Sequence, residues 1–258
     1  MEVLDMAKAI TLSNGRTWKT QKDALKHFKD MLNSYSNKDV IDVRADHEDL
    51  VALLERYDEA ITEGPSKTGT GIDYFTRTVN NFKGYATPGF WVHRKDGTET
   101  DFSYIWAVKG QPKGPSKEFY DACRAAVQAD LVDAKLSFFK QHADVNGYVP
   151  CEVTGQPTAY QDAHLDHAWI SFGQIVSSFR VSRGWTAEVP GGIVSLPADG
   201  QTQSKLIDPA VAEAFVQFHH SLATLRIVLG TVNLSMAAGQ RRPKIHRPIH
   251  LQCSSTPA

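Results

Sequence analysis

The sequence predicts an α+β fold, with two helices and a small antiparallel sheet in the first half and a mainly helical second half. The first half opens with apolar residues at helical spacing and then changes to aromatic and β-branched residues separated by glycine. Between the halves lies "KGQPKGPSKE", residues 109–118, which is rich in glycine, proline and lysine. Such a composition is typical of a linker, so we place the domain boundary at residue 110.

Two amphipathic helices are expected at the start. The first enters from Thr20, a plausible N-cap, and its apolar face consists of Ala24, Leu25, Phe28, Met31, Leu32 and Tyr35. The second lies within residues 46–60, and its apolar face consists of Leu50, Val51, Leu53, Leu54 and Tyr57. Helices followed by a sheet indicate a compact α+β unit.

Strands are predicted at residues 71–79 and 89–108, with Asp96 and Gly97 as the turn of a hairpin. The preceding "TGTG", residues 68–71, lacks the lysine and the helix of a phosphate-binding loop, so we interpret it as a turn.

In the second half, apolar spacing predicts a long helix over residues 119–138, with Ser116 as a candidate N-cap. Residues 147–169 favour two short strands around a turn, and residues 171–184 a helix capped by Ser171. A loop over residues 185–204 follows. A last helix should begin at Asp208 and Pro209 and continue to residue 229, with Val211, Phe215, Phe218, Leu222, Leu225 and Leu229 on one face.

The amino-acid composition indicates a soluble globular protein, since 41% of residues are hydrophobic and 22% are charged. No apolar run is long enough to span a membrane, and the acidic residues near the N-terminus disfavour a secretory signal, so a cytoplasmic location is expected. The three cysteines, Cys123, Cys151 and Cys253, form no Cys-x-x-Cys pair, which argues against disulfides and a structural zinc. A net charge of -1 provides no overall basic surface for nucleic acid.

One short stretch is unusually rich in groups that can transfer protons or bind metal: "DAHLDH", residues 162–167. Strand alternation puts His164 and Asp166 on one side and His167 on the other, unless the strand ends and His167 turns beside Asp166. A carboxylate next to an imidazole can hold a hard cation and deprotonate water. The alternative is that these histidines only form hydrogen bonds across a hairpin.

The stretches "CEVTG", "HLDH" and "FHHSLATLRIVLGTVNLS" resemble the HNH, or ββα-metal, endonucleases. The resemblance implies a strand pair and helix, with Asp166 as a ligand of Mg²⁺ or Mn²⁺ and His167 as the general base. Asn233 or His219 would complete the metal site, and His164 would be a supporting catalytic residue. The Ile-x-Pro that often follows Asp-His in that family is replaced here by Ala168, Trp169 and Ile170.

The first half resembles a second family, the DCL domain, through "TQKDALKHFKDMLNSY", "LLERYDEA", "TGTGIDYF" and "RKDGTETDFSYIWAVKG". In that family the domain is associated with ribosomal RNA maturation, which implies a nucleic-acid context. The domains expected are therefore a DCL-like domain over residues 1–110, an HNH-like domain over residues 111–238 and a basic, flexible tail over residues 239–258.

Other side chains have two interpretations each. Arg226, Arg94 and Lys95 are candidate phosphate contacts, or solvated surface residues. Trp169 and Trp185 would stack on bases or, as base rates favour, fill the core, and His220 is expected to face solvent.

The function predicted is a metal-dependent HNH-type endonuclease acting on nucleic acid, with double-stranded DNA favoured over RNA. Restriction, phage defence and phage DNA processing are all compatible with it. The alternative is a non-catalytic nucleic-acid-binding or RNA-processing module with a degenerate HNH-like half. The sequence leaves the oligomeric state open, a homodimer included.

Overall fold

The computed structural model describes residues 9–61, 64–82, 85–111, 113–196, 204–235 and 246–252. Helices and small antiparallel sheets occur together, which confirms the α+β class. The chain forms two compact units, Met1–Gly114 with Leu196–Gln203, and Pro115–Ser195 with Ser204–Ala258. The division follows Gly114, four residues past the boundary expected at 110.

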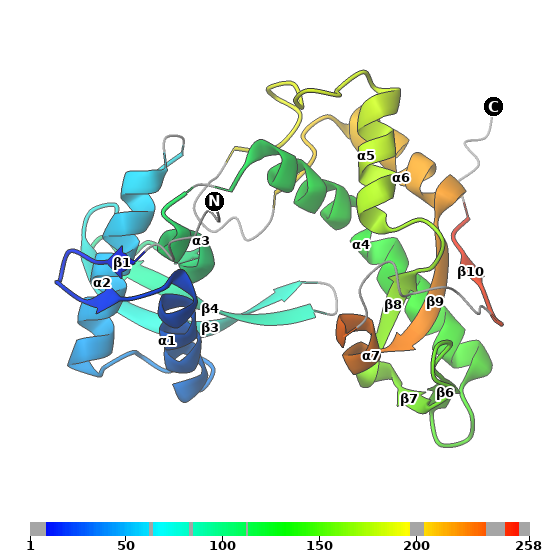
Figure 1. Ribbon diagram of the computed structural model, residues 1–258, viewed down its shortest axis with the longest axis horizontal. Coiled ribbons are helices and arrows are strands. Elements are labelled where there is room, and N and C mark those ends of the chain that lie inside the picture. Colours follow the sequence, from blue (N-terminus) through cyan, green and yellow to red (C-terminus); the bar gives the residue numbers. More distant parts are fainter. Residues whose placement is uncertain are drawn as a thin grey trace, which may run out of the picture. The chain divides into compact units, whose positions relative to one another are not determined.

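The first unit packs helices against one antiparallel sheet of order β3-β4-β5 (Figure 1). Its elements are β1 Ile10–Thr11, β2 Thr17–Trp18, α1 Gln21–Ser34, α2 Arg44–Ala60, β3 Ile72–Phe82, β4 Tyr85–Arg94, β5 Glu99–Phe102 and α3 Tyr104–Lys109. The predicted helices and the turn at Gly97 are confirmed, and the Oγ1 atom of Thr20 accepts the Asp23 N–H at 3.1 Å as the N-cap. The sheet buries Phe75, Phe90, Val92 and Phe102 in the core of this unit.

The strand expected up to residue 108 is wrong at its end, because residues 104–109 form α3. The aromatic and β-branched content of this segment favoured a strand, but two local signals favour a helix. Ser103 caps the N-terminus by accepting the Trp106 N–H, and Gly110 ends the helix in the left-handed conformation, at φ 60°.

In the second unit, helices surround a three-stranded sheet of order β10-β9-β8 (Figure 1). Its elements are α4 Pro115–His142, β6 Tyr148–Pro150, β7 Pro157–Ala159, the 3₁₀ turn Tyr160–Asp162, β8 Ala163–His167, α5 Phe172–Ser182, α6 Pro209–Leu222, β9 Thr224–Leu229, α7 Gly230–Ser235 and β10 Ile249–His250. The core lies between α4, α5, α6 and the sheet, and centres on Phe119, Ile175, Phe215, Leu225 and Ile227.

Three predictions for this unit are confirmed and four need correction. The long helix, the Ser171 cap with its Gln174 capping box, and the Asp208–Pro209 helix start are observed. The last helix ends at Leu222 rather than at residue 229, because residues 224–229 form β9 and pair with β8. Three strands replace the two expected in residues 147–169. Ser116 is inside α4, one residue after its start, and is not its N-cap.

The fourth correction concerns the predicted flexible tail. Of residues 239–258 the structure describes only residues 246–252, and there β10 pairs with β9 through Ile249 and Leu225. The His246 N–H also donates to the Glu152 carboxylate at 2.7 Å. The rest of this segment, with Cys253, lies outside the described residues.

None of the helices in the described part of the chain combines the length and the apolar character that crossing a membrane requires.

Candidate functional site

The predicted site residues gather around β8, but on its two opposite faces. Backbone pairing continues to the last residue of the strand, where His167 lies opposite Leu225. Alternation therefore holds to the end, with His164 and Asp166 on one face and Leu165 and His167 on the other. His167 does not turn beside Asp166.

On the first face, Asp166 forms a buried ion pair with Arg226. The Nε and Nη2 atoms of Arg226 donate to Asp166 Oδ2 at 3.0 and 2.9 Å, and the two residues are direct cross-strand neighbours. The Arg226 side chain is inaccessible to solvent, so the prediction of a surface phosphate contact is wrong. The positive charge beside the Asp166 carboxylate is therefore the Arg226 guanidinium, at the place where the sequence predicted a metal ion.

The same face holds His164 against α7. The Nδ1 atom of His164 lies 3.2 Å from Nδ2 of Asn233, the fourth residue of that helix. Gly230 permits this approach, since a Cβ atom at that position would lie only 3.0 Å from His164 Nε2. Desolvation, followed by the positive charge of Lys135, lowers the pKa of His164. The paired strands β8 and β9 are separated along the chain by α5 and α6, and α7 follows β9 directly (Figure 1).

On the second face, His167 begins a hydrogen-bonded chain of three histidines. Its Nε2 lies 2.9 Å from Nε2 of His219, whose Nδ1 lies 3.2 Å from Nδ1 of His220. Nε2 of His220 in turn lies 3.2 Å from Oδ2 of Asp130 on α4. All three rings are buried, so the expectation that His220 faces solvent is wrong, whereas the Asp130 side chain is 43% exposed.

The environment keeps the first two rings neutral. The rings of Phe172 and Phe215 pack near His219, and Phe172 also lies near His167. Desolvation is the main reason why the pKa of each histidine falls to about 3, and the positive charge of Arg124 contributes to both. The Arg124 guanidinium is held over the Phe172 ring, 5.0 Å from its centroid.

These contacts do not assemble the predicted metal site. Asp166 is engaged by Arg226, His219 contacts His167 across the strand from Asp166, and Asn233 contacts His164. Within the described ranges, no group of three or more His, Cys, Asp or Glu side chains is arranged to hold a metal ion. The residues therefore do not fit the Asp166, His219 and Asn233 ligand set as the sequence suggested it.

The end of β8 leads to the protein surface. Trp169, two residues after His167, is 64% exposed, so the expectation that it fills the core is wrong. Trp185, by contrast, packs against Phe119 and Phe179, as expected of a core residue. Sequence analysis missed Asp130 and Arg124, because both are ordinary charged residues on a long helix, and only the tertiary fold brings Arg124 near His167 and Asp130 to His220.

In the first unit, the predicted contact patch divides into a buried and an exposed residue. Arg94 is 5% exposed, and its guanidinium donates to the carbonyl oxygens of Lys67 and Ser66 and to the Thr98 hydroxyl. It therefore holds the turn at residues 66–71 and is not a surface contact. Lys95 is exposed, as a phosphate contact requires.

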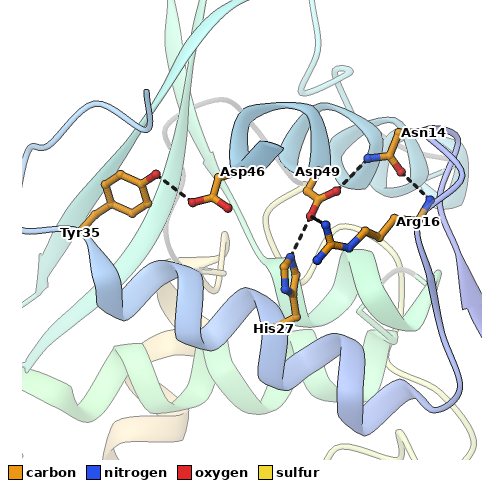
Figure 2. Close-up of polar contacts among 6 residues, drawn as sticks. All are labelled: Asn14, Arg16, His27, Tyr35, Asp46 and Asp49. Carbon is orange, nitrogen blue, oxygen red and sulfur yellow. Dashed lines mark hydrogen bonds and ion pairs between the residues drawn. The ribbon is translucent and has the colours of Figure 1, made fainter. Parts of the chain in front are cut away.

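A second polar cluster ties the N-terminal segment of the first unit to α1 and α2 (Figure 2). The buried Asp49 carboxylate accepts from Asn14 Nδ2 at 2.8 Å, lies 2.9 Å from His27 Nε2 and forms an ion pair with Arg16. The Tyr35 hydroxyl donates to Asp46, and burial, aided by this bond, raises the pKa of Tyr35 to about 12. Every partner of Asp49 in Figure 2 crosslinks separate elements, which indicates a structural role.

The match to a family model concerns the first unit. Residues 29–108 match the model of a family described as "Protein of unknown function (DUF3223)". The solution NMR structure of an uncharacterized protein from Rhodospirillum rubrum is 33% identical, with a match that covers 40% of this chain and 91% of that one, at a TM-score of 0.34. No curated protein matches the chain.

Proposed function

We propose that this protein hydrolyses phosphodiester bonds in nucleic acid, with DNA favoured, and that His167 is the general base. The observation that carries the proposal is the position of His167. Its imidazole is hydrogen-bonded through Nε2 to His219, and it lies at the end of β8, where the chain reaches the exposed Trp169. The resemblance of "HLDH" and its flanking stretches to HNH endonucleases supports the reaction class.

The chemistry of a general base suits this imidazole. A neutral imidazole carries one N–H and one bare nitrogen, and among the described residues His167 Nδ1 has no hydrogen-bond partner, so Nδ1 is available as an acceptor when Nε2 donates to His219. The low pKa keeps the ring unprotonated at neutral pH. A base of such low pKa holds a proton only briefly, so a path that takes the proton away would help it.

Two neighbouring side chains suit a nucleic-acid substrate. Arg124 is close enough to influence the pKa values of both His167 and His219, and a guanidinium is well shaped to bind a phosphate. The exposed Trp169 ring offers a stacking surface for a base, which contributes about 1–3 kcal/mol per base in single-strand complexes. We propose Arg124 as the phosphate contact and Trp169 as the base contact.

In the proposed step, a water oxygen attacks phosphorus while His167 Nδ1 takes one proton of that water. A bond forms between the water oxygen and phosphorus, and the bond between phosphorus and the leaving sugar oxygen breaks. The sugar oxygen takes a proton from solvent, so that a phosphate monoester and a hydroxyl end result.

Dependence on Mg²⁺ or Mn²⁺ stays a prediction, as do a nucleic-acid-positioning role for the first unit and a cytoplasmic location.

A non-catalytic nucleic-acid-binding module is the second candidate, and one observation favours it. The carboxylate that the resemblance assigned to the metal is paired with Arg226 instead, as in a degenerate site. Such a module would bind the same nucleic acid through Arg124 and Trp169 without cleaving it.

Incubation of the full chain with supercoiled plasmid and with structured RNA separates the two candidates. Each substrate is tested with Mg²⁺, with Mn²⁺ and with EDTA. Nicked plasmid supports the hydrolase, and abolition of nicking by EDTA would establish the metal requirement. A gel shift with intact nucleic acid under every condition would support the binding module and contradict the hydrolase.

A further inference from the structure

In the histidine chain on the second face of β8, the hydrogen bonds are all donated in one direction. Asp130, the last member of the chain, sets this direction. The chain links three separate elements, since His167 is in β8, His219 and His220 are in α6, and Asp130 is in α4. The first two links are hydrogen bonds between ring nitrogens, at 2.9 and 3.2 Å, and the third is the ion-pair contact of His220 Nε2 with Asp130 Oδ2, at 3.2 Å. Because a neutral imidazole carries one N–H and one bare nitrogen, each link needs a donor on one side and an acceptor on the other.

Asp130 settles which side donates. An ionised carboxylate only accepts, so Nε2 of His220 must carry the proton and donate to Asp130. Nδ1 of a neutral His220 is then bare and accepts from Nδ1 of His219. Nε2 of His219 is consequently bare as well and accepts from Nε2 of His167. The opposite direction would leave the bare Nε2 of His220 facing the carboxylate, with two lone pairs in contact.

We infer that Asp130 fixes the tautomer of His167 through His220 and His219, holding the proton on Nε2 and leaving Nδ1 as the acceptor. The tautomer follows from the geometry alone, whereas its role in catalysis rests on the proposed function. The logic is that of the carboxylate in a catalytic triad, which holds its histidine in the productive tautomer. Here two further imidazoles lie between the carboxylate and the base, and Asp130, His220 and His219 are positioning residues.

The surroundings support neutral rings joined in this order. Phe172 and Phe215 flank the His219 ring, which is fully inaccessible to solvent, and Arg124 adds a positive charge that disfavours a second one. Asp130 is the partly exposed end of the chain. When His167 Nδ1 takes a proton, its Nε2 proton can move to His219, the His219 Nδ1 proton to His220, and the His220 Nε2 proton to Asp130 and solvent. This is the path that a weak base requires.

The tautomers are measurable without any assay of activity. Nitrogen-15 NMR of the imidazoles in the full chain distinguishes a protonated ring nitrogen from a bare one. At pH 8, above the ordinary pKa of histidine, wild-type His167 and His220 should carry the proton on Nε2, and His219 on Nδ1. Nδ1 protonation of wild-type His167 would overturn the inference.

Three variants at α4 test the cause. In Asp130→Lys an ammonium donor replaces the carboxylate acceptor, so all three tautomers should reverse. Asp130→Glu keeps a carboxylate and should keep the wild-type tautomers. Asp133→Lys makes the same charge change at an exposed position three residues on and should have no effect. Unchanged tautomers in a folded Asp130→Lys would overturn the inference, and if this variant fails to fold, mixed tautomers in Asp130→Ala provide the same test.

Cleavage is then measured on the same variants. Asp130→Lys should lower kcat by about 10²-fold or more, while Asp130→Glu stays near wild type. Tautomers that respond as expected in a protein that never cleaves would contradict the proposed function and leave the tautomer assignment standing. Cleavage by the wild type with tautomers that ignore Asp130 would contradict the inference and leave the proposed function standing.

Discussion

Asp166 and Arg226 lie directly opposite each other in the β8–β9 ladder, sixty positions apart in sequence, and form an ion pair that is almost completely removed from solvent. Two donor groups of the guanidinium converge on one carboxylate oxygen. The pair therefore fixes the register of β8 against β9. It also fixes which face of β8 carries His164 and which carries His167.

Arg226→Met should destabilise the protein by about 3–5 kcal/mol, because it removes the guanidinium that neutralises the buried Asp166 carboxylate. The double variant Asp166→Leu with Arg226→Met removes both charges and should recover much of this loss. Urea denaturation at pH 7.5 measures both. A single variant within 1 kcal/mol of wild type would show that the pair is not buried as described.

Gly230→Ala should displace His164, because the added Cβ atom would lie 3.0 Å from its Nε2 and 3.1 Å from the Asp162 carbonyl oxygen. We expect a loss of about 1–3 kcal/mol and changed NMR resonances for His164 and Asn233. Gly191→Ala is the matched control, since a Cβ atom there meets nothing within 4 Å. Equal stability of the two variants would contradict the close approach.

Gly69→Ala tests the assignment of Arg94 to the turn at residues 66–71. Gly69 has φ +51°, and an added Cβ atom would lie 2.6 Å from Arg94 Cδ. The control is Gly15→Ala, which shares the cost of a positive φ, at +82°, but meets no neighbouring atom. Gly69→Ala should lose about 1–3 kcal/mol more than the control in urea denaturation.

Stability should fall on mild acidification because of the buried histidines. The folded-state pKa values of His167 and His219 are lowered to about 3, so the unfolded chain, with ordinary values near 6.5, binds more protons between these limits. The contribution of the two neutral histidines to the free energy of unfolding is thus complete above pH 6.5 and is lost as the pH falls toward 3. For one such histidine the loss at pH 5 is on the order of 2 kcal/mol.

Urea denaturation at pH 7.5, 6 and 5 measures this loss. His219→Gln removes one of the two groups and keeps a polar side chain, so its stability should change less steeply with pH than that of wild type. A wild-type stability that is constant from pH 7.5 to 5 would contradict the burial of neutral imidazoles.

The helices and the first sheet could be predicted because their signals are local. Thr20, Ser171 and Asp208 cap helices through bonds that span two or three residues, and the apolar spacing that follows them is read directly. The strand β9 could not be found this way. Leu222, Leu225 and Leu229 continue the helical spacing of α6, and the strand forms only because β8, far away in sequence, offers a partner.

The candidate site shows the same division. Alternation correctly placed His164 and Asp166 on the face opposite His167, since it depends only on the strand itself. The partners of these residues could not be predicted, because Arg226 and His219 are brought to them by tertiary packing. A buried arginine opposite Asp166 is what separates the observed arrangement from the metal site that the motif suggested.

The most direct test of the account is plasmid nicking by His167→Ala beside its matched control, His164→Ala, under the conditions in which wild type is most active. Both variants remove an imidazole from the same strand, but from opposite faces. If His167 is the base, its variant should lose at least about 10²-fold in cleavage rate while still binding DNA, and the control should lose much less. Full nicking by a folded His167→Ala, or loss confined to His164→Ala, would contradict the central claim.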